Sequence, residues 1–294
     1  MSCLRLTQQI LITGLNNWLK VSIIGAATPH KEMSLVLLCL FDRMEKIAMK
    51  KFELTADRIE EKGVTLHRIK ALIDFGDVKA GELGGYVEKE ENLSQYGNAW
   101  VYRHAKVFGN AYIYGNACVC GNALVYGNAW LSGKALVYGN AQVFGEARVY
   151  KNAQVLGNAR ICDYARIFDN VRIYDNARIF GDAQVFGNAW VYENAWVYDD
   201  AHIYENAWVY DDAEVYSNAR VCSNADYIYL KGFGSHNRST TIFRAKSGNI
   251  CVSCGCFIGS LQEFENKVKE THGNNKFAKE YLALVEAAKI HFEV

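Results

Sequence analysis

The sequence has little of what marks disordered, membrane-spanning or nucleic-acid-binding chains. Its 294 residues include one proline, Pro29, and 32 basic side chains balance 32 acidic ones. Zero net charge removes any global attraction to nucleic acid or to an anionic membrane. Half of the residues are hydrophobic, which argues against disorder, and no apolar run reaches the ~18 residues that cross a bilayer. We therefore expect a folded cytoplasmic protein without membrane contact and with little affinity for nucleic acid.

Phosphate-binding loops and metal-binding clusters are also scarce. No G-x-G-x-x-G or Walker pattern opens a helix, and an odd count of nine cysteines indicates reduced thiols. Only Cys251, Cys254 and Cys256 lie close together, and this C-x-x-C-x-C spacing allows a zinc or redox site. Strand alternation would place Cys251 on the face opposite the other two. We interpret the three as small buried residues, with metal binding as the weaker reading, and expect no cofactor.

What the sequence has in abundance is a six-residue repeat. From Ala99 to Ala225 one position recurs 22 times, and 21 of its residues are Ala, with Val171 the exception. An aliphatic residue follows two places later except at the last unit, and residues two apart share one side of a strand. The next two slots favour Gly (11 of 22) and Asn (15 of 22), which tolerate tight corners. Each unit predicts a strand of about four residues and a sharp corner.

A unit this short must coil into a solenoid. Pairs such as Val101 with Ala105, and Val107 with Ala111, resemble the hexapeptide-repeat proteins. These form the left-handed parallel β-helix of the bacterial transferase hexapeptide superfamily. The resemblance implies three hexads in each triangular coil of about 18 residues, and therefore about seven coils stacked at roughly 4.8 Å. The expected fold class is mainly β.

The flanking segments predict caps, because an uncapped β-helix exposes a sheet edge. We expect an N-terminal β-rich cap at 49–92, the left-handed β-helix at 93–226 and a C-terminal α+β cap at 227–294. Met49 resembles a natural protein start, so residues 1–48 are interpreted as an extension outside the fold.

The C-terminal segment predicts strands followed by two helices. A Ser260–Glu263 capping box opens the first helix, and a second amphipathic helix runs from about Lys276 to His291 with Tyr281 on its apolar face. This tail resembles the C-terminal module of uncharacterised repeat proteins from gut bacteria and their phages. The resemblance raises a phage-related protein that binds a host factor as one functional alternative.

The superfamily resemblance also implies an enzymatic alternative. Its acyltransferases carry a catalytic His, a loop that protrudes from the coils, and acyl-CoA in a groove between trimer subunits. Here the six-residue register is unbroken from Ala99 to Ala225, which leaves no insertion for such a loop. The coils hold two histidines, His104 in a corner and His202 at an outward position. A general base needs a pocket and an orienting partner, which the spacing does not supply. If the protein is an acyltransferase, one of these histidines is catalytic.

Outward side chains 18 residues apart are expected to stack on one face. This register places an arginine band beside a tryptophan cluster: Arg148, Arg160, Arg166, Arg172, Arg178, Trp190, Trp196 and Trp208. From Ile179 to Ala219 the chain has eight acidic residues and no Lys or Arg, with tyrosines such as Tyr192 and Tyr210 between them. The residue after each aliphatic is Tyr or Phe in 16 of 21 units. These ladders either stabilise the solenoid or form a binding surface.

Several ligands suit these features. Arginines with aromatics can bind a phosphate-bearing or single-stranded ligand, the acidic end can dock a protein or a carbohydrate, and the two can pair between subunits of a dimer or trimer. Asp163, Asp169 and Asp175 can instead neutralise the neighbouring arginines. The most polar loop, residues 234–239, adds His236 and Arg238 as binding candidates, with an ordinary cap turn as the alternative.

The sequence thus favours a non-catalytic, rigid repeat scaffold. Its outward aromatic and charged ladders would bind a protein partner or a second copy of the chain. The zero net charge argues against nucleic acid. An acyltransferase that uses acyl-CoA is the alternative function, although only the resemblance in fold supports it.

Overall fold

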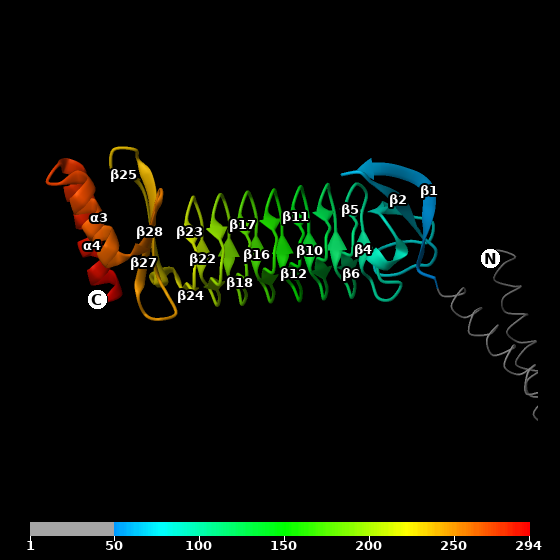
Figure 1. Cartoon of the computed structure of the whole chain (residues 1–294). Helices are drawn as coiled ribbons and strands as arrows, with labels where there is room; N and C mark the ends of the chain where they lie inside the picture. Colours follow the sequence, from blue (N-terminus) through cyan, green and yellow to red (C-terminus); the bar gives the residue numbers. More distant parts are fainter. Residues whose placement is uncertain (1–49) are drawn as a thin grey trace, which may run out of the picture. The chain divides into compact units, whose positions relative to one another are not determined.

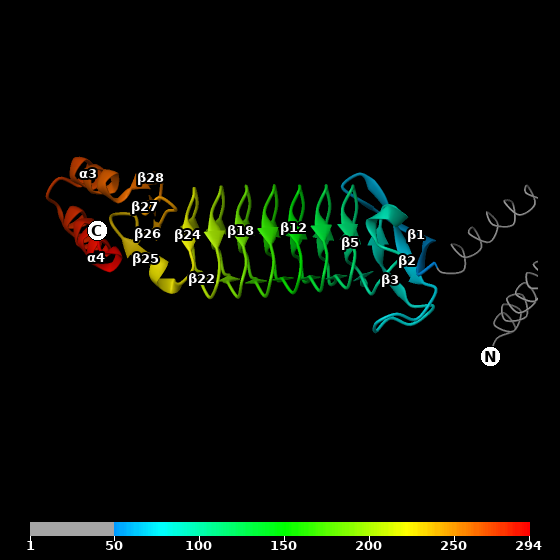
Figure 2. The same cartoon turned by 90° about the horizontal axis from the view of Figure 1, so that it is seen from below.

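The computed structural model describes residues 50–294, and Lys51–Val294 forms one compact unit (Figure 1). The expectation that residues 1–48 are an extension lies outside the described residues. Figures 1 and 2 show a stack of coils between two caps. No helix in the described part of the chain has the length and apolar character needed to cross a membrane.

The coils form a parallel β-solenoid of about eight turns with three faces. The first face contains β4 (Trp100–Val101), β7 (Cys118–Val119), β10 (Leu136–Val137), β13 (Gln154–Val155), β16 (Arg172–Ile173), β19 (Trp190–Val191) and β22 (Trp208–Val209). The second contains β5 (Lys106–Val107), β8 (Leu124–Val125), β11 (Gln142–Val143), β14 (Arg160–Ile161), β17 (Arg178–Ile179), β20 (Trp196–Val197) and β23 (Glu214–Val215). The third contains β6 (Tyr112–Ile113), β9 (Trp130–Leu131), β12 (Arg148–Val149), β15 (Arg166–Ile167), β18 (Gln184–Val185), β21 (His202–Ile203) and β24 (Arg220–Val221).

Each strand pairs with the strand 18 residues further on. For example, Arg148 lies beside Arg166, and Val149 beside Ile167. The strands are two residues long rather than the expected four, because the residues on either side already turn into the corners. The repeating alanine and aliphatic side chains are buried from Ala99 to Val221, and Val171 is buried like the alanines around it, whereas the last alanine of the repeat, Ala225, is exposed.

The corners are built on left-handed backbone. Glycines of the first corner slot have φ near +70°, as at Gly115 (70°) and Gly133 (66°). Other residues in this slot are held in the same region, among them Asp163 (56°) and Glu193 (56°). Their carboxylates accept the amide N–H of the corner one coil further on: Asp163 from Gly181 at 3.1 Å and Glu193 from Asp211 at 2.9 Å. The acidic corner residues therefore join coils.

The second corner slot adds amide ladders. The side-chain amide of Asn122 donates to Asn140 at 3.2 Å, and Asn140 donates to Asn158 at 3.1 Å. The same series continues through Asn176 to Asn194. Since each bond joins one coil to the next, the Asn preference of the repeat contributes to coil stacking as well as to the turn.

Close stacking at the corners can be tested at one glycine. A Cβ at Gly133 would lie 2.7 Å from the backbone N of Lys151, whereas a Cβ at Gly63, also at positive φ, would meet nothing within 4 Å. Left-handed strain alone costs about 1–2 kcal/mol. We expect Gly133→Ala to reduce the free energy of unfolding by about 1 kcal/mol more than Gly63→Ala does. Chemical denaturation measures both, and equal losses would mean that coil spacing does not restrict the corner.

The N-terminal cap extends the second face. A hairpin of β1 (Phe52–Glu61) and β2 (Val64–Ala71) joins β3 (Leu83–Val87), which pairs in parallel with β5. A 3-10 turn, η1 (Glu90–Asn92), leads into the coils. This arrangement confirms the β-rich cap expected from the sequence and covers the first sheet edge.

The C-terminal cap is a four-stranded antiparallel sheet with two helices on one side (Figure 2). After η2 (Asn224–Asp226) come β25 (Tyr227–Phe233), β26 (Arg238–Arg244), β27 (Ile250–Cys254), β28 (Phe257–Ser260), α3 (Leu261–His272) and α4 (Lys276–Phe292). The other side of the sheet packs on the last coil, where the Phe243 and Tyr216 rings lie 5.0 Å apart. The expected α+β cap is confirmed. The sequence missed β28, whose hairpin turn is only Gly255-Cys256.

Candidate functional site

The 18-residue register builds two columns of arginine and tryptophan on the solenoid. On the first face Arg172 lies beside Trp190, and Trp190 beside Trp208; we call these three residues the first column. On the second face the second column contains Arg160, Arg178 and Trp196. The structure therefore brings together the residues that the sequence placed together, while Arg148 and Arg166 form a separate pair on the third face.

The arginines of these columns lie against aromatic rings. The Arg172 guanidinium is 5.0 Å from the centre of the Trp190 ring, and Arg178 is 5.0 Å from Trp196. Trp190 in turn stacks on Trp208 at 5.3 Å. Guanidinium groups over indole rings gain cation–π energy of about 0.5–1 kcal/mol at exposed positions. The columns are held in place by these contacts while their outer surfaces stay exposed, as at Trp208, which is 42% exposed.

The arginine band has no carboxylate partner within the described chain. None of its members forms an ion pair or a side-chain hydrogen bond with residues 50–294: Arg148, Arg160, Arg166, Arg172 and Arg178. Asp163 and Asp169 bind the corner amides of the next coil instead. The alternative in which the corner aspartates neutralise the arginines is therefore absent from this structure.

The aromatic ladders are stacks of rings. Tyr174, Tyr192 and Tyr210 form one, with centre-to-centre distances of 4.9 and 5.5 Å. Burial raises the pKa of Tyr192 above its ordinary value, and it raises that of Tyr198, in a parallel ladder, to about 12. The stacked rings therefore stabilise the coils. Tyr192 and Tyr210, which the sequence indicated as binding residues, are partly covered by the neighbouring rings.

The two coil histidines lie in different surroundings. His104 is an exposed corner residue, and the ring of His202 lies edge-on to Phe186 at 6.2 Å. Burial, followed by the charge of Arg220, lowers the pKa of His202 below its ordinary value. Among the described residues neither imidazole has a hydrogen-bonded carboxylate that would orient it as a general base.

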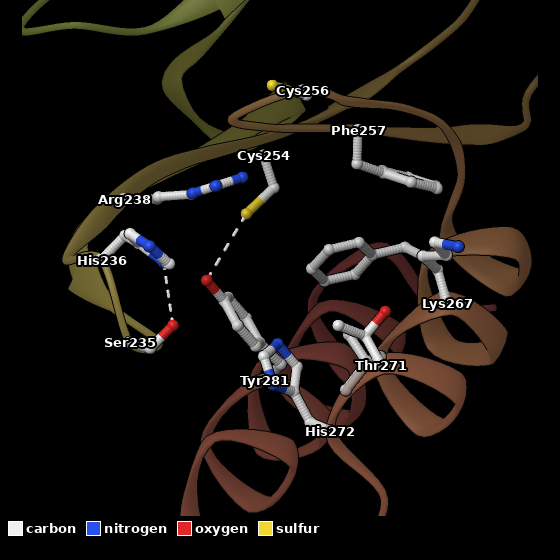
Figure 3. A pocket seen from close by; sticks show the side chains of 12 residues that line it. Ser235, His236, Arg238, Cys254, Cys256, Phe257, Lys267, Thr271, His272 and Tyr281 are labelled. Carbon is white, nitrogen blue, oxygen red and sulfur yellow. Dashed lines mark hydrogen bonds between the residues drawn. The ribbon is translucent and has the colours of Figure 1, made fainter.

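The C-terminal cap contains a pocket that unites separate sequence candidates. His236 and Arg238, from the polar loop and the start of β26, lie near Cys254 and Cys256, from the tip of the β27–β28 hairpin. The remaining walls come from Phe257, from α3 and from Tyr281 of α4 (Figure 3). The cavity volume is about 360 Å³. Cys251 lies on the solenoid side of the sheet and lines no part of this pocket.

Hydrogen bonds fix the inner wall of the pocket. The Thr240 hydroxyl donates to Cys254 Sγ at 3.1 Å, and the Cys254 thiol lies 3.7 Å from the Tyr281 oxygen. The Tyr281 hydroxyl donates to the carbonyl of Phe233 at 3.2 Å. Burial and the contact with Cys254 raise the pKa of Tyr281, which keeps the phenol protonated. Residues 50–294 contain no group of three His, Cys, Asp or Glu side chains placed to hold a metal ion. The interpretation of the three cysteines as buried is correct for Cys254 but wrong for Cys256, which is exposed in the hairpin turn.

Comparison with known proteins agrees with the coil architecture. Residues 117–133 and 183–199 match the YdcK beta solenoid repeat, and the second of these segments contains Trp190 and Trp196. The chain is a β-solenoid repeat protein. Over 42 residues the chain is 48% identical to "Uncharacterized acetyltransferase YdcK" of Escherichia coli (strain K12). This stretch is 14% of the present chain and 13% of that protein, so the chain spans only a small part of its relative.

Two buried side chains at the N-terminal end of the solenoid were not expected from the sequence. Trp100 occupies the same outward slot as Trp190 and Trp208 but is fully buried by the N-terminal cap. Lys51 is also buried, and its ammonium donates to the carbonyl of Ala99 at 2.9 Å. The repeat does not reveal the burial of either residue, because the N-terminal cap that buries them is not part of the repeat.

Proposed function

We propose that this β-solenoid is a rigid, non-catalytic scaffold that docks an acidic protein surface on its two Arg–Trp columns. The observation that supports this function is the set of exposed arginines without a carboxylate partner in residues 50–294, placed beside tryptophans. Arg, Trp and Tyr are the residues most enriched among energetic hot spots of protein interfaces. An acidic partner would supply the carboxylates that the columns lack.

The rigidity of the scaffold favours this use. Arg172 and Trp190 sit on a stack joined by backbone, amide and ring ladders, so little side-chain entropy is lost when a partner docks. A second copy of the chain is one source of acidic surface, through the segment from Ile179 to Ala219. A phage-related role in binding a host factor would use the same columns. The proposal requires no cofactor.

The test is removal of the first column's tryptophans. We expect the double variant Trp190→Ala, Trp208→Ala to fold normally and to lose at least tenfold in affinity for the partner, or in self-association, because each truncated hot spot costs about 1–4 kcal/mol. Light scattering after size exclusion measures self-association, and affinity capture with mass spectrometry identifies a heterologous partner. Tyr138→Ala is the matched control, since Tyr138 is 54% exposed on the same face. Equal binding by all three proteins would contradict the proposal.

A second function has one observation in its favour. The relative with 48% identity over 42 residues carries the name acetyltransferase. If the present chain shares that chemistry, acetyl-CoA should raise its melting temperature, and His104→Ala or His202→Ala should abolish acetyl transfer. We expect no acetyl transfer, because neither histidine has an orienting carboxylate partner within residues 50–294. A shift that either substitution removes would overturn the non-catalytic assignment.

A further inference from the structure

The charged side chains that line the pocket of the C-terminal cap are positive. Among the described residues its lining includes the cations Arg238 and Lys267 and the imidazoles of His236 and His272, but no Asp or Glu. Three nearby carboxylates lie outside the lining and are engaged: Glu270 pairs with Lys267 at 2.9 Å, Glu280 accepts the amide of Gly234 at 3.1 Å, and Glu263 accepts the amide of Ser260 at 2.8 Å. A cavity with this lining favours an anionic occupant.

Arg238 and Lys267 are the two cations that line the pocket. Lys267 is paired, and two further cations of the cap are engaged: Arg244 donates to the carbonyl of Phe292 at 3.0 Å, and Lys289 pairs with Glu265 at 2.9 Å. Arg238 forms no ion pair or side-chain hydrogen bond with any described residue. Figure 3 shows its side chain beside His236 and Cys254 at the edge of the cavity. A planar guanidinium that is free on several N–H groups binds carboxylate or phosphate with two parallel hydrogen bonds.

Aromatic side chains form an apolar wall of the same pocket. The Phe257 and Phe264 rings lie 5.2 Å apart, and the Tyr281 ring meets Phe264 edge-on at 5.5 Å. Ligand cavities typically measure about 300–1,000 Å³ and combine apolar walls with a few polar groups. The volume of about 360 Å³ falls at the small end of this range. An occupant would therefore carry a compact aromatic or aliphatic body behind its anionic group.

We propose that this pocket binds a small organic anion, in which a carboxylate or phosphate group contacts Arg238 and an apolar body lies against Phe257 and Phe264. The Ser235 hydroxyl, which lies 2.9 Å from His236 Nδ1, and the exposed Thr271 hydroxyl are neutral groups available to the same anion. No bond is made or broken at this site. It is independent of the Arg–Trp columns, so either proposal can fail without the other.

Calorimetric titration of the full chain with four probes tests the site: phenylacetate, phenyl phosphate, inorganic phosphate and the neutral phenylacetamide. We expect one or both aromatic anions to bind at least tenfold more tightly than phenylacetamide, since hydrogen bonds to charged groups contribute about 1.5–3 kcal/mol. Preference between phenylacetate and phenyl phosphate identifies the anionic group. Inorganic phosphate should bind more weakly than phenyl phosphate, because it lacks the apolar body.

Variants separate the two halves of the site. Arg238→Gln should weaken binding of the aromatic anions at least tenfold, and Phe257→Ala should weaken them while leaving inorganic phosphate unchanged. Arg166→Gln, on the solenoid, is the matched control and should bind as the parent does. Occupancy should also slow alkylation of the exposed Cys256 by N-ethylmaleimide, followed on its peptide by mass spectrometry. Equal affinity for phenylacetamide, unchanged binding by Arg238→Gln, or the absence of binding by every probe at millimolar concentration would overturn the proposal.

Discussion

Trp100→Ala is expected to reduce the free energy of unfolding by about 3–5 kcal/mol, the loss typical of a large aromatic side chain removed from a core. Trp100 is 0% exposed. Its indole lies between Phe52 and Phe75, with ring centres 6.1 and 5.2 Å away in edge-on geometry. The cavity would open where the N-terminal cap meets the first coil. Chemical denaturation followed by tryptophan fluorescence and circular dichroism measures the loss.

The solenoid offers a matched control for this substitution. Trp208 occupies the same outward slot of the same face, in β22 rather than β4, but is 42% exposed. Trp208→Ala should cost less than about 1.5 kcal/mol, because its main contact is one stacked ring. If Trp100→Ala does not fold, Trp100→Phe is compared with Trp208→Ala in its place. This substitution keeps most of the side-chain volume and removes an indole N–H that has no hydrogen-bond partner among the described residues. Similar losses for Trp100→Ala and Trp208→Ala would contradict the burial described for the cap.

The unfolding free energy should rise with pH between about 7.5 and 9.5 by about 2 kcal/mol through Lys51 alone. Burial lowers the pKa of Lys51 from 10.5 to about 8. Its ammonium lies beneath the cap, donates to the carbonyl of Ala99 at 2.9 Å and sits 4.9 Å from the centre of the Phe75 ring. In this pH range the unfolded chain keeps the proton that the folded chain has released, so rising pH favours the folded state.

Lys51→Met isolates this effect. Denaturation at pH 7.5 and 9.5 should show a rise in the parent that exceeds the rise in the variant by about 2 kcal/mol. Thiols and phenols whose pKa values are raised, such as Cys162 to about 11, act in the opposite direction as the unfolded chain ionises. Their contribution is common to both proteins and cancels in the difference. Parallel pH profiles for parent and variant would show that Lys51 is not buried as a charged group.

The repeat made most of the fold predictable. Ala105 and Val107 recur with a period that only a coiled stack of short strands can satisfy, so both the buried pairs and the 18-residue pairing could be inferred. The Arg–Trp columns could be inferred from the same 18-residue spacing, since Trp190 and Trp208 occupy the same position in consecutive coils. Because the repeat is strict, the sequence position of a residue determines its face of the solenoid and its neighbours in the adjacent coils.

The ends could not be inferred in this way. Trp100 belongs to the repeat yet is buried, because the N-terminal cap, which lies outside the repeat, folds over it. The cap pocket depends equally on tertiary contacts. His236 and Arg238 were noticeable as a polar loop, and Tyr281 as one residue of an apolar helix face, but their meeting depends on how α4 packs on the sheet. Local patterns carry no information about that packing.

If the Arg–Trp columns form the docking surface of a rigid solenoid, site-specific photo-cross-linking will trap the bound partner there. We place p-benzoylphenylalanine at position 208 or at position 138 of the same face, and expect adducts with a partner, or with a second copy of the chain, from position 208 and none from position 138. Adducts from both positions alike, or from position 138 alone, would show that docking does not use the columns.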